Sequence, residues 1–258
     1  MVHVKPTKIA LVLTCSVNPK ISAKKLSILD PEIRLQQYLC AISKWCRLLK
    51  KTNIQIFVVE NTNSISLLKS KLVKNRIDTS QVVFFECKLD LISDEFGISA
   101  GEFNMLSELT NSGLLENLDF IWKCTGRLYI ENALRIMKIS SNLPIVDRTY
   151  KPYHLANTKF FGLPKYLWSD FLSKVPKFST SEKQPSDTWR SLEHYFTYFL
   201  LRLENNQIRH MIFNEIPIFI GKSASTGSVI SGKFRNFYLL ITNKFRPLII
   251  KLLIGSAP

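Results

Sequence analysis

The first half of the chain alternates short apolar runs with segments of helical spacing. Residues 8–14 are an apolar run that ends in the polar turn 15–19. Such a run is typical of a strand that is buried on both faces of a parallel sheet. Asp30 and Pro31 suit a helix N-cap and a first helical position, and apolar residues then recur at helical spacing over 33–49. This stretch predicts a buried strand followed by a helix.

The alternation continues beyond residue 50. Further strands are predicted at 54–59, 81–85, 120–122, 144–147 and 216–220, and further helices at 66–74, 102–109, 131–139 and 187–205. Residues 90–101 are polar and are interpreted as a connecting stretch. Repetition of strand, helix and strand predicts an α/β fold with an open, mostly parallel sheet and right-handed crossovers.

Composition narrows the class of protein. Of the 258 residues, 46% are hydrophobic and 21% are charged, a balance that predicts one sizeable globular core. The net charge of +15 favours a polyanionic partner, such as nucleic acid, anionic lipid or a phosphorylated small molecule. The 5 cysteines show no C-x-x-C spacing, which argues against a disulfide framework or a zinc ribbon and fits a reducing cytosol. We find neither a signal peptide nor a transmembrane stretch.

Polar residues collect where the predicted strands end. Thr14 and Ser16 follow the first strand, Glu60 and Asn61 follow the second, and residues 123–127 follow the strand that contains Trp122. Because the carboxyl ends of parallel strands meet at one edge of a sheet, we expect these three segments to form one site. The alternative is that each is a turn that caps its strand.

The segment after Trp122 has the chemistry of a diphosphate site. Lys123 and Arg127 bracket Thr125 and Gly126. Arginine offers a fork to phosphate oxygens, lysine a point charge, and glycine lets backbone amides approach a ligand closely. The alternative is a surface turn with two solvated bases.

A loop of small residues follows the predicted strand 216–220. It contains Ser225, Thr226 and Gly227 and is followed by Lys233. Its hydroxyl and amide groups suit phosphate or sugar hydroxyls, although the spacing is not that of a Walker loop because Ser228 stands where lysine is needed. A flexible linker is the alternative.

Glu193 lies in an aromatic, amphipathic helical segment. A carboxylate held on a rigid helix among apolar neighbours suits a general base, whereas most helical glutamates are only solvated. Glu102 can be explained as an ordinary acid in the first turn of a helix. The 4 histidines show no metal-ligand spacing.

The C-terminal residues 234–258 contain no acidic residue and interleave basic with aromatic and aliphatic ones. We expect a segment that lies on an anionic membrane surface, after one globular domain over residues 1–233. A packed terminal helix and an RNA-binding segment are the alternatives, although no RRM, KH or helix-turn-helix pattern is present.

Taken together, these stretches resemble a group of bacterial glycosyltransferases found in capsule and lipopolysaccharide gene clusters. The matching segments are residues 8–19, 30–45, 57–61, 101–102, 123–129 with Asn132, and 225–227. The resemblance implies a GT-A-like, Rossmann-type fold. It also implies transfer of a sugar from a nucleotide-activated donor to a growing glycan.

On this resemblance we assign hypothetical roles to the candidate residues. Glu193 is expected to take the proton of the acceptor hydroxyl if the enzyme inverts the configuration of the sugar, and only to position the substrate if the enzyme retains it. Thr14, Ser16, Glu60 and Asn61 are expected to bind the nucleoside. The expected diphosphate and donor residues are Gly101, Glu102, Lys123, Thr125, Gly126, Arg127, Ser225, Thr226, Gly227 and Lys233.

One departure from the metal-dependent GT-A pattern affects the cofactor prediction. Such enzymes hold a divalent cation with an Asp-x-Asp motif, yet residues 120–122 are followed by Lys-Cys-Thr-Gly-Arg. We therefore expect no cofactor, with Lys123 and Arg127 stabilising the leaving diphosphate. Asp90, Asp94 and Glu95 remain the acidic candidates for a metal ion.

The resemblance also implies partners and a location. We expect a glycan or lipid-linked glycan acceptor, and a cytoplasmic enzyme that is peripheral to the inner face of the bacterial membrane. No specific nucleic acid is expected. The competing hypothesis is a non-catalytic α/β protein that binds RNA or phosphorylated ligands through its positive charge.

Overall fold

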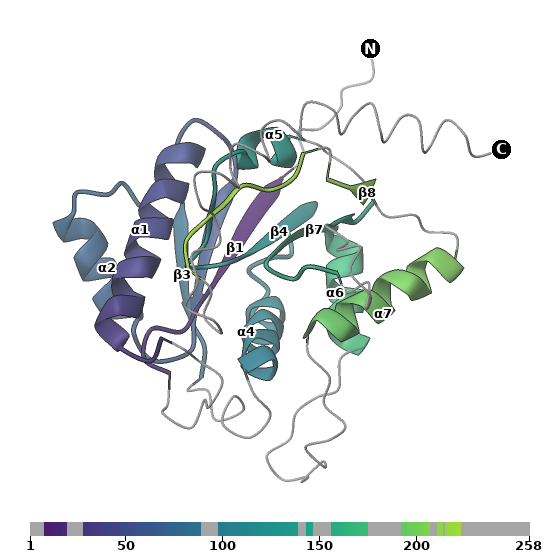
Figure 1. Ribbon diagram of the computed structural model, residues 1–258, viewed down its shortest axis with the longest axis horizontal. Coiled ribbons are helices and arrows are strands. Elements are labelled where there is room, and N and C mark those ends of the chain that lie inside the picture. Colours follow the sequence, from purple (N-terminus) through teal and green to yellow (C-terminus); the bar gives the residue numbers. More distant parts are fainter. Residues whose placement is uncertain are drawn as a thin grey trace, which may run out of the picture.

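The computed structural model describes residues 8–19, 28–88, 98–138, 143–146, 156–174, 192–206, 211–213 and 215–222. A twisted sheet runs through the middle of the molecule with helices around it (Figure 1). The helices are α1 (Pro31–Leu49), α2 (Ile65–Lys74), α4 (Ile98–Asn111), α5 (Ala133–Met137), α6 (Lys165–Lys174) and α7 (Leu192–Asn205).

The sheet has seven strands in the order β3-β2-β1-β4-β7-β6-β8. They are β1 (Ile9–Cys15), β2 (Gln55–Glu60), β3 (Val82–Glu86), β4 (Phe120–Thr125), β6 (Ile145–Val146), β7 (Phe160–Pro164) and β8 (Met211–Ile212). Only β7 runs antiparallel to its neighbours β4 and β6, while the other pairs are parallel. Two short strands, β5 (Tyr129–Ile130) and β9 (Phe219–Ile220), form a separate antiparallel pair. The predicted open, mostly parallel α/β sheet flanked by helices is confirmed.

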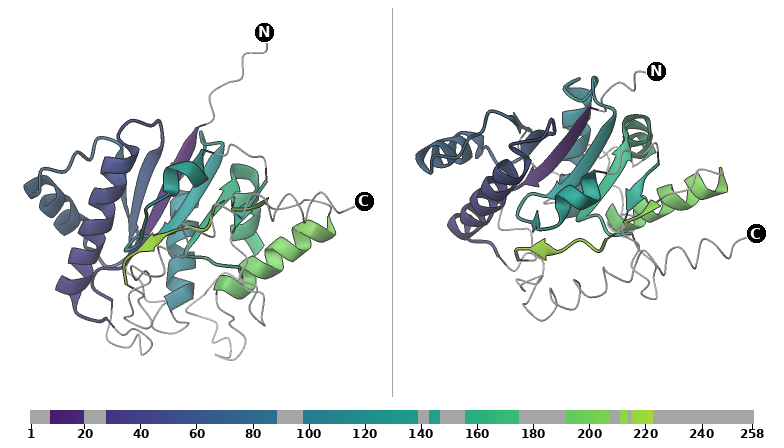
Figure 2. Two further views of the ribbon diagram at one scale, coloured as in Figure 1. Left: turned by 45° about the horizontal axis from the view of Figure 1, so that its top comes forward. Right: turned by 90° about the horizontal axis from the view of Figure 1, so that it is seen from above.

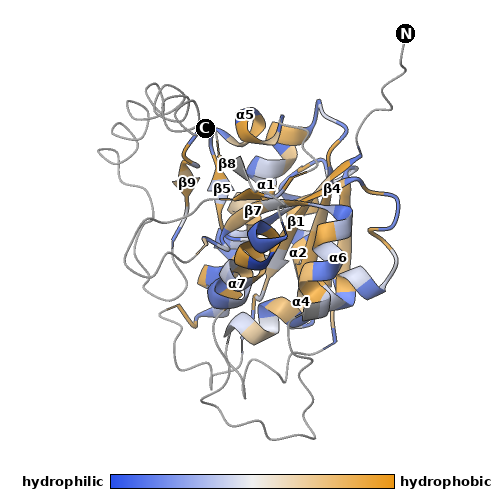
Figure 3. Ribbon diagram, turned by 90° about the vertical axis from the view of Figure 1, so that its right-hand side faces the viewer, coloured by the Kyte–Doolittle hydropathy of each residue, from blue (hydrophilic) through white to orange (hydrophobic). Residues whose placement is uncertain are grey.

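Side chains alternate between two hydrophobic cores, one on each face of the sheet. In β1, Leu11 and Leu13 pack with α1, α2 and α5, whereas Ala10 and Val12 pack with α4, α6 and α7. Figure 2 shows α1 and α2 (purple to blue) at one side of the molecule and α6 and α7 (green) at the other. The central strands are largely hydrophobic, while the helices carry residues of both kinds (Figure 3). The strands are therefore buried on both faces, as their continuous apolar runs predict.

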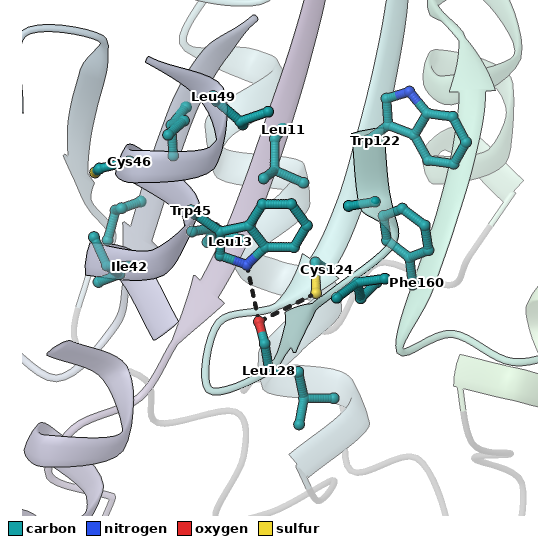
Figure 4. Close-up of a cluster of buried hydrophobic side chains, with 14 of the residues drawn as sticks. Leu11, Leu13, Ile42, Trp45, Cys46, Leu49, Trp122, Cys124, Leu128 and Phe160 are labelled. Carbon is teal, nitrogen blue, oxygen red and sulfur yellow. Dashed lines mark hydrogen bonds between the residues drawn. The ribbon is translucent and has the colours of Figure 1, made fainter. Parts of the chain in front are cut away.

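Trp45 attaches α1 to the turn that follows β4. Its indole is fully buried, and Nε1 donates a hydrogen bond of 2.9 Å to the carbonyl oxygen of Leu128 (Figure 4). The thiol of Cys124 lies 3.6 Å from the same oxygen. Since Leu128 directly follows Arg127, the core fixes the backbone of the segment that the sequence singles out for ligand binding.

Several predicted boundaries are wrong. Strand β4 continues to Thr125, beyond the predicted end at Trp122, because ladder pairing with β1 carries it through polar residues. Helix α4 begins at Ile98, inside the stretch interpreted as polar connection. Strand β9 covers only Phe219–Ile220, and α5 is shorter than predicted. The antiparallel strand β7 is absent from the prediction.

The N-cap of α1 provides a test of the local sequence signals. A side-chain oxygen of Asp30 accepts hydrogen bonds from the backbone amides of Glu32 at 2.8 Å and Ile33 at 3.3 Å. Replacing Asp30 by Ala leaves both amides without this acceptor, and we expect the free energy of unfolding to fall by about 1 kcal/mol. Asp30→Asn keeps an acceptor and should lose much less. Urea denaturation of the three proteins measures the difference, and equal midpoints for the Ala and Asn variants would contradict the cap.

Candidate functional site

The carboxyl ends of β1 and β4 form the switch point of the sheet, because β2 and β3 lie on one side of β1 and β4 lies on the other. Ligands of open α/β sheets bind outside such a point. The Gly126 amide donates a hydrogen bond of 2.9 Å to the Thr14 carbonyl oxygen. A Cβ at Gly126 would lie 2.6 Å from the Cys15 sulfur and 2.7 Å from that oxygen. Contrary to our expectation, glycine here serves the close approach of two strand ends, and its amide is already bonded within the protein.

On the face covered by α4 and α7, the side chain of Lys123 is fully buried. Its ammonium nitrogen lies 2.7 Å from Oε1 of Glu102, 2.7 Å from the Thr158 carbonyl oxygen and 3.3 Å from the Thr125 hydroxyl. An ammonium group has three protons, so these three acceptors account for all of them. Lys123 is thus held by internal partners.

Two further hydrogen bonds extend this cluster. The Thr14 hydroxyl donates 2.6 Å to Oε1 of Glu102, and the Thr158 hydroxyl donates 2.8 Å to Oε1 of Glu193. Glu102 lies beyond the first turn of α4, which contains no acid, so the explanation of Glu102 as a first-turn helix acid is wrong. The predicted residues Thr14, Glu102, Lys123, Thr125 and Glu193 therefore gather in one cluster.

The opposite face, covered by α1, carries a second cluster built around Tyr38. The guanidinium carbons of Arg34 and Arg127 each lie 5.9 Å from the centre of the Tyr38 ring. Nε of Arg34 donates 2.8 Å to the carbonyl oxygen of Ser16, and Nη1 donates 3.2 Å to that of Ile28. The Ser16 amide in turn donates 2.9 Å to the Tyr38 hydroxyl. Arg34 and Tyr38 thus fix the start of the segment that follows β1.

Both arginines are buried, with exposed fractions of 3% for Arg34 and 5% for Arg127. Burial lowers the pKa of Arg34, the neighbouring Tyr38 opposes this effect, and the charge of Arg127 adds to it. Nη1 of Arg127 contacts Oε1 of Gln37 at 3.3 Å, while its buried Nε has no partner among the described residues. Within that part of the chain, neither arginine has a carboxylate partner in an ion pair. A buried charge of this kind is costly unless an anion accompanies it.

The end of β2 has a structural task. The carboxylate of Glu60 is fully buried and accepts hydrogen bonds from the amides of Val17 at 3.1 Å, Thr62 at 2.8 Å and Ser64 at 2.9 Å, as well as from the Thr62 hydroxyl. Glu60 therefore joins the segments that follow β1 and β2. Asn61 is also buried, and Ser16 is half-buried. Nucleoside binding by these residues stays a prediction.

Lys123 and Arg127 consequently lie in different clusters on opposite faces of the sheet. A strand turns successive side chains to opposite faces, and Lys123 shares the face of Ile121, whereas Arg127 lies beyond the strand, with α1. Our expectation of two cations that bracket one diphosphate does not match this placement. Arg34, Tyr38 and Thr158 were absent from the predicted site. Arg34 and Tyr38 could have been found, since they lie four residues apart on the apolar side of α1.

Part of the predicted site lies outside the described residues. This applies to Ser225, Thr226, Gly227, Lys233 and the acidic candidates Asp90, Asp94 and Glu95, as well as to the segment 234–258. Gly221, which opens the small-residue loop, is described. Its φ is +144°, and a Cβ there would lie 2.7 Å from the Arg127 carbonyl oxygen. Gly101 is buried in α4 next to Glu102.

Two features of the described ranges concern metal binding and membrane crossing. These ranges contain no group of three or more His, Cys, Asp or Glu side chains that could hold a metal ion. None of the helices in these ranges is long and apolar enough to cross a bilayer.

Comparison with known proteins gives similarity in structure only. No family model and no curated protein matches the sequence. The inositol-1-phosphate CTP transferase from T. maritima is 13% identical, with 93% of this chain and 97% of that chain covered and a TM-score of 0.49. A putative nucleotide-diphospho-sugar transferase from Desulfovibrio desulfuricans G20 is 7% identical, with 80% of each chain covered and a TM-score of 0.48.

A third similar structure is a glycosyltransferase involved in glycosylation of the major capsid of PBCV-1. It is 10% identical, with 91% of this chain and 99% of that chain covered and a TM-score of 0.45. None of these three TM-scores reaches 0.5. Function must therefore be inferred from this chain's own residues.

The pair of Lys123 and Glu102 can be tested by a double-mutant cycle. Lys123→Met leaves a partly buried carboxylate without its cation, and we expect a loss of about 3 kcal/mol in the free energy of unfolding. Glu102→Gln leaves the fully buried ammonium without its anion and should cost a similar amount. The double variant should be more stable than the sum of the two losses predicts, by about 1 kcal/mol or more. Additive losses in chemical denaturation would show that the two charges do not depend on each other.

Proposed function

We propose that the chain is a glycosyltransferase, which moves a sugar from a nucleotide-activated donor to a glycan acceptor. One observation carries the proposal: two buried arginines without a described carboxylate partner lie at the carboxyl ends of β1 and β4. A nucleoside diphosphate brings the negative charge that this position lacks. The resemblance of the sequence to bacterial capsule and lipopolysaccharide glycosyltransferases supports the same donor.

Arg127 is the side chain we assign to the diphosphate. Its Nε has no partner among the described residues, and Gln37 engages only its Nη1. A guanidinium fork can hold two phosphate oxygens and stabilise the charge that develops when the bond between sugar and diphosphate breaks. Lys123, whose three protons are engaged internally, supports the site instead. We propose that arginine thereby replaces the divalent cation of Asp-x-Asp enzymes.

Glu193 is the proposed general base. It is the second residue of α7, and its carboxylate is held by the Thr158 hydroxyl at the same end of β4 as the other site residues. In the proposed reaction the acceptor hydroxyl oxygen forms a bond to the anomeric carbon, the bond to the nucleoside diphosphate breaks, and the hydroxyl proton passes to Glu193. Inversion of the sugar's configuration follows from such a single displacement.

Donor binding tests the proposed function directly. Nucleoside diphosphate sugars should raise the melting temperature of the chain, because a ligand that binds the folded state stabilises it by mass action. Arg127→Met should weaken the binding of the best donor by roughly tenfold to a hundredfold, since a hydrogen bond to a charged group is lost. Excess EDTA in every titration also tests binding without a divalent metal.

The matched control is Arg47→Met, which removes the same charge from an exposed position near the end of α1. It should bind the donor as the unmodified chain does. Equal donor affinity for Arg127→Met would remove Arg127 from the site. Stabilisation by RNA but by no nucleotide sugar would favour the non-catalytic alternative.

We further propose that the acceptor is lipid-linked and that residues 234–258 bring the enzyme to an anionic membrane surface. Changing the basic residues of this segment, Arg235, Lys244, Arg246 and Lys251, to Gln in the full chain should reduce binding to phosphatidylglycerol vesicles at least tenfold, because each base near such a surface contributes about 1 kcal/mol. The control changes an equal number of exposed bases near α1 and α2, namely Arg47, Lys51, Lys69 and Lys74. Equal loss of vesicle binding in both variants would show that net charge alone causes binding and would contradict a specific role of residues 234–258.

A further inference from the structure

Thr158 lies between the buried ammonium of Lys123 and the carboxylate of Glu193 and contacts both. Its carbonyl oxygen accepts the 2.7 Å hydrogen bond from Lys123, and its hydroxyl donates the 2.8 Å hydrogen bond to Glu193. Only 3% of Thr158 is exposed. No sequence pattern points to Thr158, and it has none of the roles proposed for the other residues of the site.

The turn that contains Thr158 is fixed to the sheet on one side. The Thr125 amide donates 3.0 Å to the Lys159 carbonyl oxygen, and β7, which follows directly, pairs with β4 from Phe160 onward. Lys123, with its three acceptors, holds the Thr158 carbonyl oxygen from within the same strand β4. The backbone of Thr158 is therefore attached to the carboxyl end of β4.

The same turn holds α7 on its other side at two successive levels of the helix. Thr158 bonds the Glu193 side chain, and the Ala156 amide donates 2.8 Å to the Thr197 hydroxyl, one helical turn further on. That hydroxyl donates 2.7 Å to the carbonyl oxygen of Glu193. Glu193 is thus restrained through its side chain and through its backbone.

We propose that Thr158 is a positioning residue for Glu193: with Lys123 beneath it, its hydroxyl sets the orientation in which the carboxylate meets the acceptor hydroxyl. This inference rests on the proposed function, in which Glu193 is the base. The Thr158 hydroxyl has a single proton and donates it to an ionised carboxylate, which only accepts. A base must be ionised before it takes a proton, and hydrogen bonding to the charged form favours that form.

Replacing Thr158 by Val and by Ser separates positioning from packing. Valine keeps the shape of threonine but loses the hydroxyl, whereas serine keeps the hydroxyl. For Thr158→Val we expect kcat for sugar transfer to fall by about tenfold to a hundredfold, with KM for the donor unchanged. The acidic limb of its kcat profile should move to higher pH. Thr158→Ser should restore both. Equal kcat and pH profiles for the two variants would overturn the proposal.

A second measurement does not depend on activity. The side-chain carboxyl carbon of Glu193 can be titrated by carbon-13 NMR, with its signal assigned by its absence in Glu193→Gln. Loss of the hydroxyl donor in Thr158→Val should raise the pKa of Glu193 by roughly one pH unit relative to the unmodified chain, and Thr158→Ser should not.

The two measurements separate the inference from the proposed function. If no nucleotide sugar is consumed by the unmodified chain, the proposed function fails, while the titration still decides whether Thr158 controls Glu193. If transfer proceeds and the titration of Glu193 is the same in the Val and Ser variants, the function stands and the role of Thr158 is refuted.

Discussion

The buried ammonium of Lys123 is the constraint around which the carboxyl ends of β1 and β4 are arranged. A charge taken out of water costs several kcal/mol unless its protons are all accepted, and it therefore fixes the groups that accept them. Its acceptors come from three places in the chain: the end of β4, helix α4 and the turn before β7. The ammonium holds each of these groups in place. Glu102 also accepts a hydrogen bond from the hydroxyl of Thr14 in β1. The ammonium of Lys123 and the carboxylate of Glu102 thus join four segments: β1, α4, the end of β4 and the turn before β7.

The buried positive charges on the two faces of the sheet differ in their partners. On the side of α4, Lys123 is matched by the carboxylate of Glu102. On the side of α1, Arg34 and Arg127 share one tyrosine ring and, among the described residues, form no ion pair with a carboxylate. The first arrangement is complete in itself, while for the second we propose that an anion from outside supplies the missing negative charge. This difference is why we assign the diphosphate to Arg127 and the supporting role to Lys123.

Much of the fold could be predicted because the apolar runs of β1, β2 and β4 are continuous and the N-cap at Asp30 is explicit. The gathering of polar residues at the strand ends also followed from parallel topology. It could not be predicted from the sequence that Lys123 and Arg127 lie on opposite faces of the sheet. Lys123 follows the alternation of a strand, but the direction of Arg127 depends on how closely Gly126 packs on β1. The contacts of Thr158 could not be predicted, because Lys123 and Glu193 each lie 35 residues from it in the sequence and only the folded sheet brings them together.

The separation of the two clusters suits the chemistry that we propose. A diphosphate and a catalytic carboxylate repel each other, and a base that sits beside the leaving group would also compete for the arginine that stabilises it. Here the end of β4 lies between them, with Arg127 on the α1 side and Glu193 on the α7 side. In the reaction that we propose, the leaving group therefore lies toward the α1 side of the strand end and the acceptor toward the α7 side. An in-line displacement needs the nucleophile and the leaving group on opposite sides of the reacting carbon, and a strand end flanked by unlike charges provides both directions.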